Sequence, residues 1–93
     1  MLHKDLAKNF AVVLQKQRKS RRISQAALAE RADCDSTMIS LIERQIRNPT
    51  LNLADSLARG LEIPLSQMIL EAENLRARSD LNDFAIYLIS KFC

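Results

Sequence analysis

The sequence predicts an all-α domain, and three observations support that fold class. A chain of 93 residues is long enough for one hydrophobic core and too short for two. Apolar residues recur at spacings of three and four along most of the chain, which is the period of an amphipathic helix. The chain holds 1 Gly and 2 Pro, too few turn residues for a β-sandwich or a β-barrel. We therefore expect a compact series of short helices.

The first helix is expected over about residues 5–20. Its apolar side is marked by residues at i, i+4, i+7 and i+8, which are Leu6, Phe10, Val13 and Leu14. Arg18 lies on the same side, four residues beyond the last of these. Because an unpaired buried charge is very costly, the Arg18 guanidinium must reach solvent or meet a carboxylate.

Two short helices are expected next, each beginning after a capping residue. Ser24 is a good N-cap for one helix and Asp35 for the other. Asp33 tolerates turn conformations, so the chain can change direction between them. The second helix is expected to bury Ile39, Ile42 and Ile46. Its opposite face carries Thr37, Ser40, Leu41 and Arg44. The pair spans about residues 24–45, which is the spacing of a helix-turn-helix.

Two further helices are expected on either side of Pro64. Thr50 caps the first, after a loop that Pro49 enforces. Its buried side is expected at Leu53, Ala54, Leu57, Ala58 and Leu61. The second, the fifth helix of the chain, is expected to use Leu65, Met68, Ile69, Ala72 and Leu75.

The last segment, residues 79–93, is predicted to form an additional C-terminal helix for dimerisation. Its interface is expected at Leu81, Phe84, Ile86, Leu88, Ile89 and Phe92. A helix that is apolar nearly all round must be buried on more than one side, and a second subunit supplies the second side. Two alternatives remain open, an edge strand and a cap on the monomer's own core. Ser79 and Asp80 form a helix start, which favours the helix over the strand.

The sequence offers little material for catalysis or for ligand binding. Its 2 Cys and 1 His cannot form a metal quartet or a nucleophile–base pair, and there is no Gly-rich phosphate loop. We expect no enzyme, no cofactor and no small-molecule ligand. The longest apolar run, residues 84–89, is far shorter than the roughly 20 residues of a membrane span. The start of the chain has no secretory pattern, so we expect a cytoplasmic protein.

Charge is distributed unevenly along the chain. The total is +3, yet residues 1–48 hold ten Lys and Arg against five acids. Residues 49–93 hold four basic residues against six acids. A basic first half joined to a mildly acidic remainder is typical of a surface that binds a polyanion.

These elements, taken in order, resemble the Cro-type, lambda-repressor-like helix-turn-helix regulators, also called the xenobiotic-response-element family. The resemblance covers about residues 10–70. It is carried by Ser24-Gln25-Ala26-x-Leu28-Ala29, Ile39-Ser40-x-Ile42-Glu43-Arg44, Arg47-Asn48-Pro49-Thr50-Leu51 and Leu57-Ala58. It implies a five-helix domain, residues 1–78 here, that binds a double-stranded operator DNA as a homodimer and regulates transcription.

The resemblance also implies roles for individual residues. Base reading falls to Ser36, Thr37, Ser40 and Leu41, whose short or branched side chains can approach base edges and thymine methyl groups. Phosphate contacts fall to Gln25, Arg44, Arg47 and Asn48, with added electrostatic contact from Lys19, Arg21 and Arg22. The family places a structural ion pair at the positions of Arg18 and Glu43.

The sequence departs from the family at four turns. The family often has Gly where this chain has Arg22, Asp33, Gln45 and Glu62. A left-handed conformation at a residue other than Gly costs roughly 1 kcal/mol. These turns are therefore expected either to differ locally or to lower the stability.

A helical protein-interaction module, such as an antitoxin whose main partner is a protein, is the alternative function. Salt dependence separates the two hypotheses, because binding through phosphates weakens steeply as salt rises. Within the DNA-binding hypothesis three biological roles are open, namely a restriction–modification controller, a phage repressor and an antitoxin.

Overall fold

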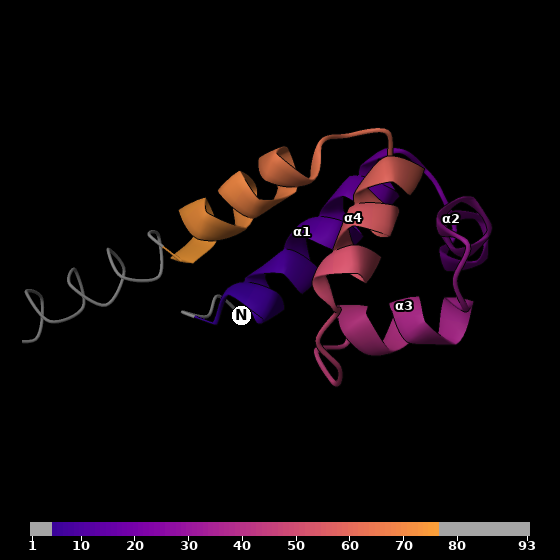
Figure 1. The fold of residues 1–93 in the computed structure, drawn as a ribbon, viewed down its shortest axis with the longest axis horizontal. Coiled ribbons are helices and arrows are strands. Elements are labelled where there is room, and N and C mark those ends of the chain that lie inside the picture. Colours follow the sequence, from indigo (N-terminus) through magenta and orange to yellow (C-terminus); the bar gives the residue numbers. More distant parts are fainter. Residues whose placement is uncertain (1–4, 77–93) are drawn as a thin grey trace, which may run out of the picture.

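The computed structural model describes residues 5–76, which form five helices and no strand. The first four are α1 (Leu6–Ser20), α2 (Gln25–Ala32), α3 (Ser36–Glu43) and α4 (Leu51–Gly60). A fifth helix runs over residues 65–76 and is named helix 65–76 here. In Figure 1, α2 and α3 lie at one end of the domain and helix 65–76 lies at the other. The all-α fold is confirmed, and the predicted helix in residues 79–93 lies outside the described residues.

Local capping sets the start of each of the four labelled helices. The Ser24 hydroxyl accepts a hydrogen bond from the backbone N–H of Ala27 at 3.0 Å. The Thr50 hydroxyl accepts one from Leu53 at 3.0 Å. Asp35 accepts one from the Thr37 N–H at 2.9 Å, and Asp5 caps α1 in the same way. These bonds satisfy amide groups that have no partner inside the helix, so the three predicted caps are confirmed.

The four labelled helices also end alike, each followed by a residue other than Gly in the left-handed conformation. The φ angles are 56° at Arg22, 54° at Asp33, 62° at Gln45 and 61° at Glu62. At the end of α4 the N–H of Glu62 donates to the Arg59 carbonyl at 2.9 Å, and the N–H of Ile63 donates to Ala58 at 3.1 Å. The same pair of bonds closes the other three helices, which is the Schellman motif. These are the four positions at which the family that the sequence resembles often has Gly.

The single glycine of the chain serves close packing and not a turn. Gly60 is buried near the end of α4, which packs against α2. A Cβ atom added to Gly60 would lie 2.9 Å from Cδ1 of Leu28, a side chain that is itself fully buried. The absence of a side chain at this position therefore lets the two helices approach each other.

The core is formed by one face of every helix, and α2 packs on α3 and α4 while α3 also packs on α1. Its largest fully buried apolar side chains are Val13, Leu14, Leu28, Ile39, Ile42, Leu57, Leu61 and Met68. One predicted core residue was wrong, because Ile46 is 64% exposed. The helix ends at Glu43 and Gln45 turns left-handed, so the helical period that placed Ile46 below Ile42 stops before reaching it. No helix among residues 5–76 is long and apolar enough to cross a membrane.

Candidate nucleic-acid interface

A buried ion pair fixes the end of α3 to the end of α1. The Arg18 guanidinium donates from Nε to Glu43 Oε2 at 2.7 Å and from Nη2 to Glu43 Oε1 at 2.9 Å. The two side chains are 11% and 1% exposed. The hydrogen bond to Glu43 raises the pKa of Arg18, against the opposing effect of burial. The predicted pairing of Arg18 with Glu43 is confirmed.

Two further contacts extend this pair to the turn between α1 and α2. Arg18 Nη1 donates to the Ile23 carbonyl at 2.9 Å, and Gln25 Nε2 donates to Glu43 Oε1 at 3.1 Å. One carboxylate therefore holds the end of α1, the start of α2 and the end of α3. Among residues 5–76 no buried side-chain nitrogen or oxygen lacks a partner, so the network is satisfied.

The four predicted base-reading residues all lie on α3. Thr37 is exposed, while Ser36, Ser40 and Leu41 are half-buried. The backbone N–H of Thr37 donates to Asp35, and the backbone carbonyl of Ser40 accepts a hydrogen bond from Arg44. Neither interaction involves a side-chain hydroxyl. Within residues 5–76 the hydroxyl groups of Ser36, Thr37 and Ser40 make no hydrogen bond. They are available to a ligand on this face.

The predicted cations after α3 are exposed and lie close to the end of that helix. Arg44 Nε donates to the Ser40 carbonyl at 3.4 Å. The N–H groups of Ile46 and Arg47 both donate to the Leu41 carbonyl, at 2.9 and 3.3 Å. These bonds fold the loop back against α3, and they keep the exposed side chains of Arg47 and Asn48 near its last turn.

The remaining predicted cations lie at the other end of the motif. Lys19, Arg21 and Arg22 are exposed around the end of α1, and only Ile23 separates Arg22 from the N-cap Ser24. The N–H of Arg22 donates to the Lys19 carbonyl at 3.0 Å, so the turn that holds them is ordered. Basic residues therefore precede the start of α2 along the chain. The hydrogen bond from Gln25 to Glu43 connects the start of α2 to the end of α3, where Arg44 follows.

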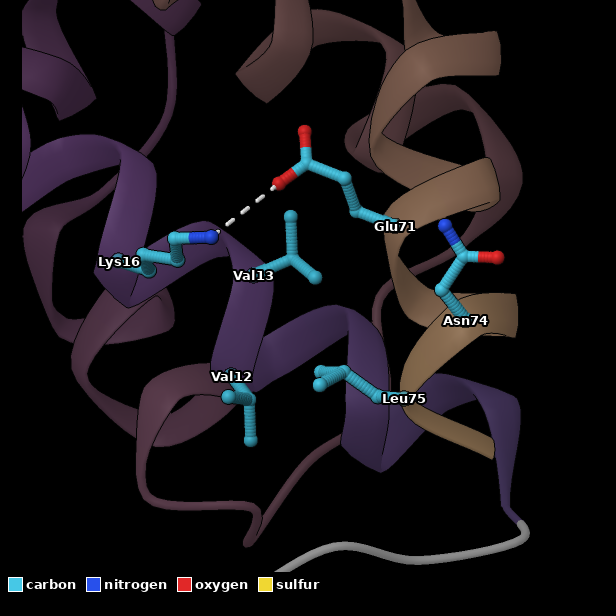
Figure 2. A pocket seen from close by; sticks show the side chains of 6 residues that line it. All are labelled: Val12, Val13, Lys16, Glu71, Asn74 and Leu75. Carbon is cyan, nitrogen blue, oxygen red and sulfur yellow. Dashed lines mark ion pairs between the residues drawn. The ribbon is translucent and has the colours of Figure 1, made fainter. Parts of the chain in front are cut away.

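One polar cluster was not predicted from the sequence. Gln17 Nε2 donates to both oxygens of Glu71, at 3.0 and 2.9 Å, and Gln17 Oε1 accepts from Arg21. Lys16 Nζ lies 3.8 Å from the same carboxylate. Figure 2 shows Lys16 and Glu71 facing each other across a pocket of about 350 Å³ between α1 and helix 65–76. None of the residues that line the pocket comes from α2 or α3, so it is separate from the helix-turn-helix.

A family model for helix-turn-helix proteins matches residues 14–68, more than half of the chain. The chain belongs to the lambda-repressor-like helix-turn-helix family. A search of curated protein sequences gave no significant match. The family and the fold are those of transcription regulators.

Solved structures of related helix-turn-helix proteins agree with this assignment. The restriction-modification controller protein C.AhdI from Aeromonas hydrophila is 30% identical, with a TM-score of 0.64 over 71% of this chain and 98% of its own. The controller C.Esp1396I bound to a 25 base pair operator site is also 30% identical, with a TM-score of 0.66 over 73% and 93%. The clp gene regulator ClgR from Corynebacterium glutamicum shares the fold at 20% identity, with a TM-score of 0.81 over 95% of both chains.

Proposed function

We propose that this protein is a transcription regulator that recognises a specific double-stranded DNA site by placing α3 in the major groove. One observation carries the proposal. The Arg18–Glu43–Gln25 network ties the end of α3 to α1 and α2, while the outer face of α3 presents short side chains with unused hydroxyl groups. A recognition helix needs such support, because base discrimination depends on the placement of a few atoms.

The chemistry of the α3 face suits base edges. Hydroxyl groups of Ser36, Thr37 and Ser40 can donate to or accept from any base in the major groove, and Leu41 can contact a thymine methyl group. No acidic side chain interrupts these four positions along α3. Hydroxyls are less selective readers than Arg or Gln, so part of the specificity is assigned to DNA shape.

Phosphate binding is assigned to the two ends of the motif. The start of α2 offers backbone amides that the cap leaves free, together with the positive end of the helix dipole. The Gln25 amide nitrogen carries two hydrogens, of which Glu43 accepts one, and the second can donate to a phosphate. Exposed cations complete the contact at Lys19, Arg21, Arg22, Arg44 and Arg47, with Asn48 beside them.

The protein is proposed to act as a homodimer. One helix-turn-helix reads only a few base pairs, and two symmetry-related copies bind half-sites about one turn of DNA apart. The 25 base pair operator in the complex of C.Esp1396I is long enough for such a pair. Residues 79–93 are the proposed dimerisation helix. Sedimentation of the full chain and of a version ending at Arg78 tests that assignment, since the shorter chain is expected to dissociate more readily.

Selection of bound duplexes from a random pool tests the proposed function. The expected result is an enriched sequence with two inverted half-sites. Affinity for the selected duplex should fall with salt at a log–log slope of about −0.9 for each phosphate contacted. An unenriched pool, or affinity that does not change with salt, would favour a protein partner instead.

A further inference from the structure

A series of polar contacts connects helix 65–76 with the end of α1. Gln17 Nε2 donates to both oxygens of the Glu71 carboxylate, at 3.0 and 2.9 Å. Gln17 Oε1 accepts a hydrogen bond from Nη1 of Arg21, one helical turn further along the chain. The same Nη1 donates to the Gln17 backbone carbonyl at 3.3 Å. The Glu71 carboxylate is thereby linked to the Arg21 guanidinium through a single side-chain amide.

The Glu71 carboxylate determines which way the Gln17 amide faces. An amide has one donor end and one acceptor end, whereas an ionised carboxylate only accepts hydrogen bonds. The Gln17 nitrogen therefore faces Glu71, and the Gln17 oxygen is turned toward Arg21. A reversed amide would set its oxygen against the carboxylate and its N–H groups against the guanidinium, so both contacts would be lost. Glu71 thus selects the orientation of Gln17 that binds Arg21.

The intervening amide holds Arg21 without neutralising its positive charge. Among residues 5–76 the ion-pair partner of Glu71 is Lys16, whose Nζ lies 3.8 Å from the carboxylate (Figure 2). Arg21 contacts Gln17 through Nη1 alone, so within the same residues its Nε and Nη2 groups have no acceptor. An arginine with free N–H groups can form a bidentate contact with a phosphate.

We infer that Glu71 is a positioning residue for DNA binding, which acts through Gln17 to hold Arg21 ready for a phosphate. The inference rests on the proposed function and assigns a part in DNA binding to helix 65–76, which lies outside the helix-turn-helix. Arg21 is exposed and lies three residues before Ser24, the N-cap of α2, where phosphate binding is proposed. An arginine that is ordered before binding loses less side-chain freedom when it meets the phosphate, and the affinity is higher for that reason.

Charge and positioning predict opposite effects when Glu71 is removed. Glu71→Ala makes the protein more basic, and by charge alone it should strengthen binding to any duplex. Through the lost positioning it should instead weaken binding to the selected and the random duplex by about 3- to 10-fold for each copy bound, which is the cost of ordering one arginine. Glu73→Ala is the matched control, because Glu73 is an acid of the same helix that pairs with Arg76 at 3.5 Å. The control should bind duplex at least as tightly as the parent.

Titration of a double-mutant cycle with duplex at low salt tests the inference. Glu71→Ala is expected to weaken binding in the parent and not in an Arg21→Ala background, where the arginine to be positioned is absent. Glu71→Gln removes the same charge but keeps an oxygen that can accept from Gln17, so it should bind more tightly than Glu71→Ala. Gln17→Ala interrupts the same contacts from α1 and should reproduce the loss, so it replaces Glu71→Ala if thermal unfolding shows that variant to be unfolded.

Three results overturn the inference while they retain the proposed function. One is a parent chain that binds duplex and a folded Glu71→Ala that binds as tightly or more tightly. Another is an equal loss in the parent and the Arg21→Ala backgrounds, which would show that Glu71 acts on the fold as a whole. The third is a Glu71→Gln variant that binds no better than Glu71→Ala. A parent chain that binds no duplex overturns the proposed function and this inference together.

Discussion

The Arg18 guanidinium and the Glu43 carboxylate meet through two hydrogen bonds, of 2.7 and 2.9 Å, although they lie 25 residues apart in the sequence. Because the pair is buried, its main effect is to define where α3 lies and not to add net stability. The Gln25 amide on the same carboxylate couples this positioning to the proposed phosphate contact.

Removing one partner of this pair is expected to destabilise the protein strongly. Arg18→Met leaves Glu43 buried without its partner and should lower the free energy of unfolding by about 3–5 kcal/mol. The double variant Arg18→Met/Glu43→Leu removes both charges and should recover most of that loss. Urea denaturation measures the free energy of unfolding of the single and the double variant. Equal losses in the single and double variants would show that the pair itself stabilises the fold.

Base reading and phosphate binding are expected to separate by mutation. Thr37→Ala or Ser40→Ala should weaken binding to the selected duplex by about 1–3 kcal/mol, with little change on random duplex. Gln25→Ala and Arg47→Ala should weaken both alike, because phosphates carry no sequence information. Titration of each variant with the two duplexes measures the ratio of its affinity for the selected duplex to its affinity for random duplex. If the Thr37 and Ser40 variants keep the parent's preference, then α3 has been given the wrong role.

The left-handed closure of α4 predicts that Glu62→Gly is stabilising. Glu62 has a φ of 61°, which strains a residue with a Cβ atom, and its side chain is exposed. The gain should be about 0.5–1 kcal/mol, since the added freedom of Gly in the unfolded chain offsets part of the relief. Glu62→Ala keeps the Cβ atom and serves as the control. A glycine variant no more stable than the alanine variant in urea would show that the turn is not strained.

The Cys34 thiol is expected to react slowly with alkylating reagents. It is also expected to make the folded protein less stable at alkaline pH. Burial, followed by the nearby charges of Asp35 and Asp33, raises its pKa. The folded state thus favours the protonated thiol. The contribution of the protonated Cys34 thiol to the free energy of unfolding is complete below the thiol's ordinary pKa of about 8.5. It is lost as the pH rises through the higher pKa of the folded state.

Two measurements check this in a Cys93→Ser background. Alkylation by iodoacetamide near pH 8 should be slower for the native protein than for the urea-unfolded protein. The fall in stability at alkaline pH should be smaller after Cys34→Ser. A native thiol that reacts as fast as the unfolded one would contradict the raised pKa.

Much of the fold was predictable because its signals are local. A cap such as Ser24 acts on amides two or three residues away, and the apolar spacing that predicted burial of Ile39 and Ile42 spans single turns. Ile46 was misplaced because apolar spacing does not reveal where a helix closes. The Gln17–Glu71 contact was missed because it joins polar residues 54 positions apart, and either residue alone is typical of a solvated surface.

In the candidate site, the ion pair inside the domain was easier to predict than the contacts of individual side chains with DNA. The resemblance predicted the pairing of Arg18 with Glu43 correctly. The apolar stripe alone left two outcomes open for Arg18, namely contact with solvent or with a carboxylate. The assignments of bases and phosphates to individual side chains stay predictions, because they depend on where DNA lies.

The four helix ends closed without glycine also bear on how long a folded copy survives. At the roughly 0.5–1 kcal/mol expected for Glu62→Gly, the four left-handed residues together remove about 2–4 kcal/mol, a sizeable share of the roughly 5–15 kcal/mol that holds a typical domain together. The unfolded fraction is correspondingly larger, and unfolded chains are what cellular proteases degrade. For a regulator whose occupancy of DNA follows its concentration, we therefore expect the left-handed residues Arg22, Asp33, Gln45 and Glu62 to shorten the lifetime of the protein once its synthesis stops.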